Sequence, residues 1–185
     1  RVVGCGSGDR TGQVKPGDHP QFFQWPAPEG RSRESSIVLD GEGRFWHDGA
    51  RVEHPGMQRA FASWIDRHPD DGRFILTNGW DWTYFTVEDV PYFVRFLQVE
   101  PSAVRLLLSD DSEELLDPAS LVVGANDAVY LRVKGGRFEA RLGQEAQTGL
   151  APLLVETETG APALEICGAS YAIGTRGSAS RRTGP

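Results

Sequence analysis

The chain has 185 residues, of which 39% are hydrophobic and 24% are charged, and its formal net charge is −7. This length suits one compact domain or two small ones with a shared core. No apolar run approaches the roughly 20 residues that cross a bilayer, and the negative charge disfavours a phosphate-binding surface. The sequence therefore predicts neither a membrane span nor a nucleic-acid partner.

The first 34 residues are rich in glycine and proline and show no apolar periodicity, which predicts a mobile tail. Its aromatic segment, residues 21–26, is expected to dock on the body or on a partner. Residues 176–185 are predicted to form a second, disordered tail. Between the tails we predict two halves, residues 35–100 and 101–175.

The first half begins with predicted strands at residues 35–39 and 44–47, separated by the turn residues 40–43. A helix is predicted from Pro55 to about Asp66, because apolar side chains recur on one helical face. We expect this face to bury Phe61, Trp64 and Ile65. A β-hairpin follows, with strands 73–77 and 80–86 around Asn78 and Gly79. Residues 88–91 form a turn, and residues 92–100 are extended.

The second half repeats this order with different residues. Strands are predicted at 104–109, 128–134 and 137–142, a weaker helix at 144–156, and a closing hairpin at 162–167 and 171–173. Each half therefore contains several antiparallel strands and one helix. The pattern predicts an α+β fold built by internal duplication.

Four stretches in this order carry a family resemblance. They are residues 39–49, the turn 86–92, the segments 131–133 and 136–142, and the closing residues 166–171. From about Ser35 to Gly174 the chain resembles a family of uncharacterised bacterial proteins, domain-of-unknown-function family 1285. The resemblance implies two related α+β halves, the second loosely like a pleckstrin-homology domain, with a ligand site between them and no known reaction. Residues 78–82 and Cys167 depart from the family pattern, so a ligand that contacts them would differ here.

The sequence offers little support for catalysis. His47 and His54 flank the loop before the first helix, and a small hydrolase that pairs one of them with a carboxylate is the enzymatic alternative. Neither has a third ligand at a recognised metal spacing. We therefore predict no catalytic residue, metal or cofactor, and consider a non-enzyme the better interpretation.

Aromatic residues are dense around the predicted hairpin. The period of two places Trp80, Trp82 and Tyr84 on one face of the strand and Phe85 on the other. If Phe85 faces the core, the Trp82 face is partly exposed and suits a ligand; the alternative is that this face is itself core. The predicted ligand-binding residues are Trp46, Trp80, Asp81, Trp82, Glu88, Asp89 and Arg132.

These features favour a binding or regulatory module with a role in signalling, which recognises a peptide, a protein or a small ligand between its halves. The two cysteines, Cys5 and Cys167, are too few for a disulfide scaffold, so a reducing cytoplasm is expected. Residues 2–5 also resemble a lipoprotein cleavage site. A lipid-anchored interaction protein of the periplasm or cell surface, attached through Cys5, therefore stays open as an alternative.

Overall fold

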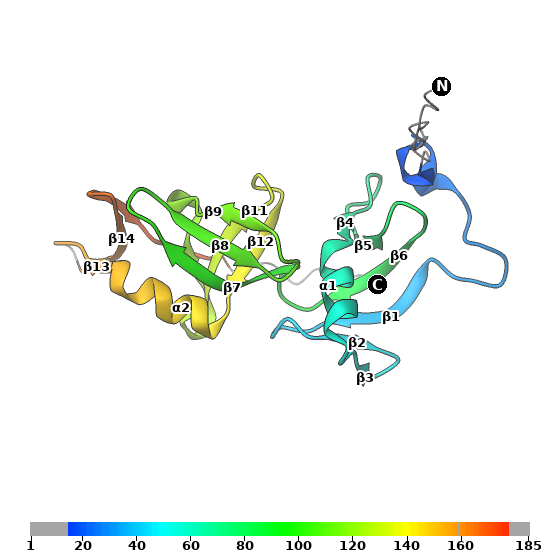
Figure 1. Ribbon diagram of the computed structural model, residues 1–185, viewed down its shortest axis with the longest axis horizontal. Helices are drawn as coiled ribbons and strands as arrows, with labels where there is room; N and C mark the ends of the chain where they lie inside the picture. Colours follow the sequence, from blue (N-terminus) through cyan, green and yellow to red (C-terminus); the bar gives the residue numbers. More distant parts are fainter. Residues whose placement is uncertain (1–14, 159, 178–185) are drawn as a thin grey trace, which may run out of the picture.

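The computed structural model describes residues 15–158 and 160–177 and has an α+β fold. Two β-sheets lie next to each other along the long axis of the molecule (Figure 1). A third, smaller sheet lies at the end of the molecule formed by the second half. Cys5, on which the lipid-anchor alternative depends, lies outside the described residues.

The first sheet has the strand order β3-β2-β1-β6-β5-β4. Its only parallel pair among the described strands is β1 with β6, which joins two antiparallel meanders. The strands and the helix of this half are β1 (Glu34–Leu39), β2 (Phe45–His47), β3 (Ala50–Arg51), α1 (Pro55–Ser63), β4 (Ile65–Arg67), β5 (Phe74–Thr77) and β6 (Trp82–Val87).

The second sheet has the order β16-β10-β11-β12-β7-β8-β9, and the third has the order β13-β14-β15. These elements are β7 (Tyr92–Val99), β8 (Val104–Leu108), β9 (Glu113–Leu115), β10 (Val122–Val123), β11 (Val129–Val133), β12 (Phe138–Leu142), α2 (Gln144–Leu150), β13 (Leu154–Glu156), β14 (Pro162–Ile166), β15 (Ala169–Ala172) and β16 (Gly174–Thr175). Short 3-10 helices are η1 (Pro16–Asp18), η2 (Phe22–Gln24), η3 (Pro118–Ser120), η4 (Ala125–Asp127) and η5 (Ala151–Leu153).

Apart from β16, which adds a seventh strand beside β10, the two large sheets share a strand order. In each, two three-stranded meanders meet through a parallel pair, β1 with β6 in the first sheet and β7 with β12 in the second. Each half also has one helix, but α1 connects β3 to β4, whereas α2 follows β12. The strand order is what internal duplication predicts, and the position of the helix is not.

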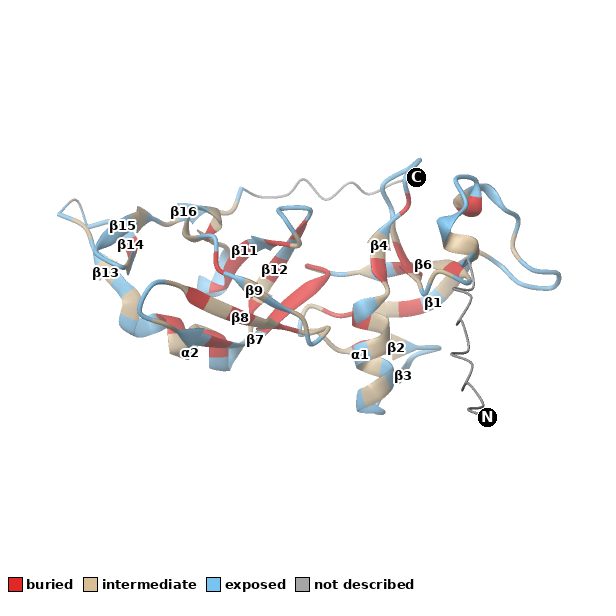
Figure 2. Cartoon of the chain, turned by 45° about the horizontal axis from the view of Figure 1, so that its top comes forward, coloured by how far each residue is buried: buried red, intermediate tan, exposed pale blue. Residues whose placement is uncertain are grey.

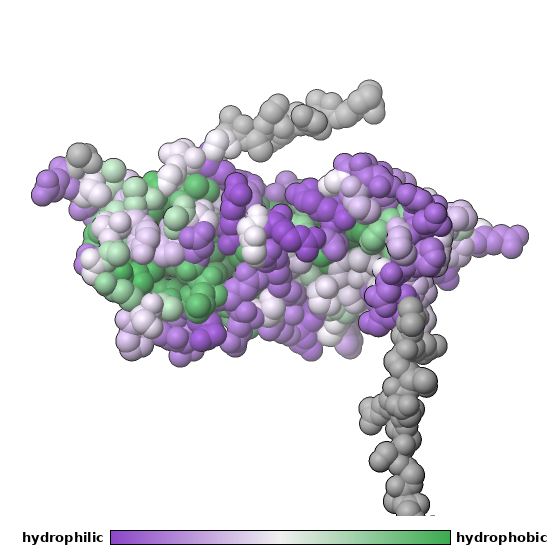
Figure 3. Space-filling model, turned by 90° about the horizontal axis from the view of Figure 1, so that it is seen from above, coloured by the Kyte–Doolittle hydropathy of each residue, from purple (hydrophilic) through white to green (hydrophobic). Residues whose placement is uncertain are grey.

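The predicted boundary at residue 100 places β7 in the first half, but β7 lies at the centre of the second sheet, between β12 and β8. The change of sheet therefore falls in the short connection between β6 and β7. Buried apolar side chains from both halves form one continuous core. Figure 2 colours the buried residues red along both halves of the chain. The surface between the halves is mainly hydrophilic in the view of Figure 3, whereas apolar residues gather over the second half.

Helix α1 is shorter than predicted. His54 caps its N-terminus by accepting the N–H of Met57, and Pro55 occupies the first turn, as the sequence indicates. The helix ends at Ser63 because the carbonyl of Trp64 accepts the N–H of Thr77, which draws the chain into β4. Ile65 is buried as a strand residue, whereas Phe61 and Trp64 are only half-buried.

The weaker predicted helix is also shorter: α2 ends at Leu150. Pro152 then lies in η5, and β13 follows from Leu154. Cys167, expected in a strand, lies exposed in the turn between β14 and β15. In the part of the chain that the structure describes, no helix is long and apolar enough to cross a membrane.

Candidate functional site

The turn between β1 and β2 is organised by Asp40. Its carboxylate accepts hydrogen bonds from the backbone N–H groups of Glu42 and Arg44. It also accepts one from the side-chain Nε–H of Arg44 at 2.8 Å and one from the indole Nε1–H of Trp46 at 2.9 Å. Burial alone would raise the pKa of Asp40, but these four donors outweigh it and lower the pKa to about 2. The turn is therefore held rigidly, with Trp46 fixed beside it.

A cavity of about 640 Å³ opens beside this turn. Trp46 and Glu88, two of the predicted site residues, line it together, and the Glu88 carboxylate accepts the Gly41 N–H at 3.2 Å. Arg44 and Arg141 supply its positive charges. The volume lies within the range of known ligand sites, roughly 300–1,000 Å³.

Arg141 of β12 reaches across from the second half. Its guanidinium donates to the carbonyl of Gly41 at 2.8 Å, which ties the second sheet to the β1–β2 turn. A further cavity of about 680 Å³ is lined by Gly41, Arg141, Phe93 and the first turn of α2. Because Gly41, Glu42 and Arg141 line both cavities, the two form one polar region between the halves. We call this region the junction site.

Asp89 lies in the connection between the sheets and fixes this connection to the second half. Its carboxylate accepts the Tyr130 hydroxyl at 2.9 Å and pairs with Arg176 at 2.8 Å. Arg176 also pairs with Glu139, and its guanidinium lies 3.8 Å from the centre of the Tyr130 ring. Burial and the Asp89 carboxylate raise the pKa of Tyr130. Arg176 was placed in the disordered tail, but in the structure it is a fixed part of this network, and residues 178–185 lie outside the described chain.

Four predicted residues lie away from the junction site, and the first two are Trp80 and Arg132. Trp80 belongs to the loop between β5 and β6, where 48% of its surface is exposed. Arg132 lies exposed on β11 and lines none of the cavities described above. The arginine that reaches the β1–β2 turn is instead Arg141, which stands opposite Tyr130 in the β11–β12 pair.

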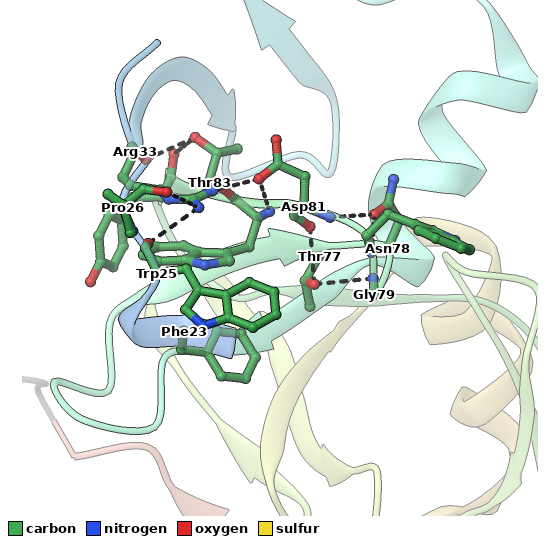
Figure 4. Close-up of polar contacts among 12 residues, drawn as sticks. Phe23, Trp25, Pro26, Arg33, Thr77, Asn78, Gly79, Asp81 and Thr83 are labelled. Atoms are coloured by element: carbon green, nitrogen blue, oxygen red, sulfur yellow. Dashed lines mark hydrogen bonds and ion pairs between the residues drawn. The ribbon is translucent and has the colours of Figure 1, made fainter. Parts of the chain in front are cut away.

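Asp81 and Trp82 lie on the other side of the first half, beside residues 15–26, which we call the N-terminal strap. Trp82 is only 6% exposed and forms a separate small core with Phe22 and Ile75. Arg33 lies over the Trp82 ring, pairs with Asp81 and donates to the carbonyl of Trp82 (Figure 4). The Trp82 face is thus neither open to solvent nor part of the main core, since the strap covers it.

Sequence reasoning also missed His68. It follows β4, is buried, and packs its ring against Phe23, Trp82 and Tyr84. Burial and the nearby Asp71 carboxylate raise the pKa of Tyr84 to about 12. The aromatic content of residues 22–25 was the signal for such a cluster, but the sequence did not show which face it covers.

The hydrolase alternative requires His47 or His54 to pair with a carboxylate. The Nε2 of His47 lies 3.7 Å from Asp48 Oδ2, beyond hydrogen-bonding distance, and both side chains are largely exposed. The Nδ1 of His54 accepts a backbone N–H as the helix cap. In the described chain neither histidine forms the hydrogen bond to a carboxylate that this interpretation requires. The described residues also contain no cluster of three or more side chains suited to a metal ion.

Comparison with family models gives no match, and no curated protein matches the chain. Solved structures do match. A DUF1285 family protein from Silicibacter pomeroyi DSS-3 has a TM-score of 0.62 at 18% identity, over 83% of this chain and 92% of that protein. A DUF1285 family protein from Shewanella baltica OS155 has a TM-score of 0.52 at 18% identity, over 65% and 94%. The chain therefore adopts the fold of these solved DUF1285 proteins.

Proposed function

We propose that the chain is a member of the DUF1285 family and acts as a non-enzymatic binding module whose ligand occupies the junction site. The observation that carries this proposal is the cavity of about 640 Å³ in which Trp46 and Glu88 meet Arg141 from the other half. A ligand in this cavity contacts both halves, so its binding would favour one arrangement of the two sheets. That coupling is the physical basis for a regulatory or signalling role.

The chemistry of the cavity favours a ligand with an amino or guanidinium group. The two arginines that line it already have partners, because Arg44 pairs with Asp40 and Arg141 donates to Gly41. Glu88 is exposed, and in the described chain its carboxylate contacts only a backbone N–H. A cation beside Glu88 would also lie near the indole of Trp46, where a cation–π contact adds to the ion pair.

A basic side chain of a partner peptide meets these requirements. The probes are therefore two capped tripeptides that differ only in the central residue, arginine or glutamate. Thermal unfolding of the protein is followed at increasing concentrations of each. We expect the arginine peptide to raise the Tm and the glutamate peptide to leave it unchanged, since only a ligand that binds the native state stabilises it.

Two variants test whether the arginine peptide stabilises the protein by binding at the junction site. Glu88→Gln should abolish the stabilisation by the arginine peptide, because it removes the charge and little else. Glu53→Gln is the matched control, since Glu53 is exposed and lines neither cavity of the junction site. If the arginine peptide does not stabilise the protein, or stabilises Glu88→Gln equally, the junction site does not bind this class of ligand.

The likeness of the second half to a pleckstrin-homology domain also stays a proposal. It is supported by the seven-stranded sheet and by α2, which follows β12 and packs on β7. Superposition of residues 92–177 on pleckstrin-homology domains would test it.

A further inference from the structure

The N-terminal strap is fitted closely to the outer face of β5 and β6. Phe22 is only 2% exposed and packs with Ile75 and Trp82. The N–H of Gly17 donates to the carbonyl of Gly79 at 2.7 Å. A Cβ atom on Gly17 would lie 2.9 Å from the Cα of Gly79, so only glycine allows this approach. The strap, which is folded into the 3-10 helices η1 and η2, therefore contacts the face through a side-chain anchor and a backbone contact, as a bound peptide does.

The far end of the strap lies on Arg33. Its guanidinium donates to the carbonyl of Pro26 at 3.0 Å and to the carbonyl of Trp25 at 3.4 Å, while also pairing with Asp81 (Figure 4). The same guanidinium lies 4.3 Å from the centre of the Trp82 ring. Arg33 and Trp82 thus form the floor on which the strap rests.

Two donors in this floor have no acceptor. The Nε of Arg33 and the Nε1 of Trp82 are both buried, and neither has a hydrogen-bond partner among the described residues. Burying a donor without a partner is unfavourable, and nearly all buried polar groups in native proteins are paired. The strap therefore covers the face without satisfying its polar groups. A ligand with an acceptor at this point would bind the same face better than the strap does.

We propose that the outer face of β5 and β6 is a docking site for a short peptide that adopts the 3-10 turns of the strap, and that the strap is its intramolecular occupant. The partner peptide carries a phenylalanine that takes the place of Phe22 and, next to it, an acceptor side chain that pairs with the indole N–H of Trp82. The strap must be displaced for this peptide to bind. This surface lies apart from the junction site, whose cavities are lined by none of Ile75, Trp82 and Gly79.

The experiment uses the full chain and labelled synthetic peptides of residues 15–26, with fluorescence anisotropy as the readout. Gly17→Ala in the full chain weakens the strap without touching its aromatic anchor, and Phe22→Ala removes that anchor. We expect both variants to bind the peptide at least roughly tenfold more tightly than the unaltered chain, in which the attached strap competes at high effective concentration. Circular dichroism establishes that each variant is folded.

Substitutions made in the synthetic peptide leave the folding of the full chain unaffected. Phe22→Ala in the peptide should weaken binding by roughly thirtyfold or more, as for a buried anchor, and Gly17→Ala in the peptide should also weaken it. Phe23 is adjacent to the Trp82 ring, with 6.0 Å between the ring centres, so Phe23→Gln and Phe23→Leu form a matched pair. We expect the glutamine peptide to bind more tightly than the leucine peptide, because its amide oxygen is an acceptor.

Two results would overturn the docking site. The first is that the unmodified peptide does not bind to a folded Gly17→Ala chain, and the second is that the peptide variants at positions 17 and 22 bind as tightly as the unmodified peptide. Equal binding of the glutamine and leucine peptides would overturn the acceptor side chain that we propose for the partner. Adding Glu88→Gln to the Gly17→Ala chain should leave peptide binding unchanged, which separates this site from the junction site.

Discussion

Asp40 provides the sharpest test of how the junction site is built. It accepts three donors from its own turn and a fourth from Trp46 on β2, and residues of that turn line both cavities between the halves. Asp40→Asn keeps the shape of the side chain and removes its charge. It also places an amide NH₂ group among donors, where only an acceptor fits. The substitution should therefore destabilise the turn and the cavities beside it.

The magnitude follows from the pKa of Asp40, which is lowered from 3.8 to about 2. A lowering of nearly two units corresponds to roughly 2–3 kcal/mol in the free energy of unfolding. Because the pKa is lower in the folded state, this contribution is fully present above about pH 4, the ordinary range of an aspartate. It is lost as the pH falls from there through about 2, where the folded carboxylate becomes protonated.

Urea unfolding followed by tryptophan fluorescence measures this contribution. The free energy of unfolding is compared between the unaltered chain and Asp40→Asn at several pH values from 7 down to 2. The difference cancels the titration of the other carboxylates, and we expect it to shrink below pH 4. A difference that stays constant across this range, or is near zero at pH 7, would refute the assigned role of Asp40.

Three further substitutions test the packing. Arg176→Met should lower the free energy of unfolding by about 1–3 kcal/mol, because the half-buried Asp89 loses its charged donor. A double-mutant cycle with Asp89→Asn, measured by thermal unfolding, should show coupling between the two residues. Gly43→Ala should cost about 1–3 kcal/mol in chemical unfolding, because Gly43 has φ of +80° and its Cβ would lie 2.9 Å from an aromatic ring on β7. Gly30→Ala is its control, with φ of +74° and open space around it, and should cost less. Phe61→Ala should cost less than the about 3–5 kcal/mol of a fully buried phenylalanine, and a larger loss in the melting curve would contradict its half-buried position.

Local patterns allowed much of the fold to be predicted. The turn at residues 40–43, the strands on both sides of it and the α+β class follow from turn residues and alternation that act over a few positions. The start of α1 was also predictable, because a proline at the first helical position is a local signal. Its end was not, since Trp64 leaves the helix to bond with Thr77 on another strand.

The junction site could be predicted only in part, because it also depends on contacts between distant strands. Trp46 and Glu88 were identified from aromatic density and the turn, and they do line one cavity. Arg132 and Arg141 are both arginines on strands of the second half, and only the pairing of β12 with β7 decides which one reaches Gly41. Such a register is a property of the assembled sheet, and a single sequence does not contain it in a readable form.

The two proposed sites divide the aromatic residues that the sequence placed together. Trp46 is held by Asp40 with its indole N–H paired, so its ring is a fixed wall of the junction site. The indole N–H of Trp82 has no hydrogen-bond partner among the described residues, and Trp82 is covered by a segment of its own chain. A paired, half-buried indole suits a ligand that enters an existing cavity, whereas an unpaired, covered indole suits one that must first displace the cover. The two proposals therefore place two ligands on different surfaces of the first half, and only the proposed ligand at Trp46 would also contact the second half.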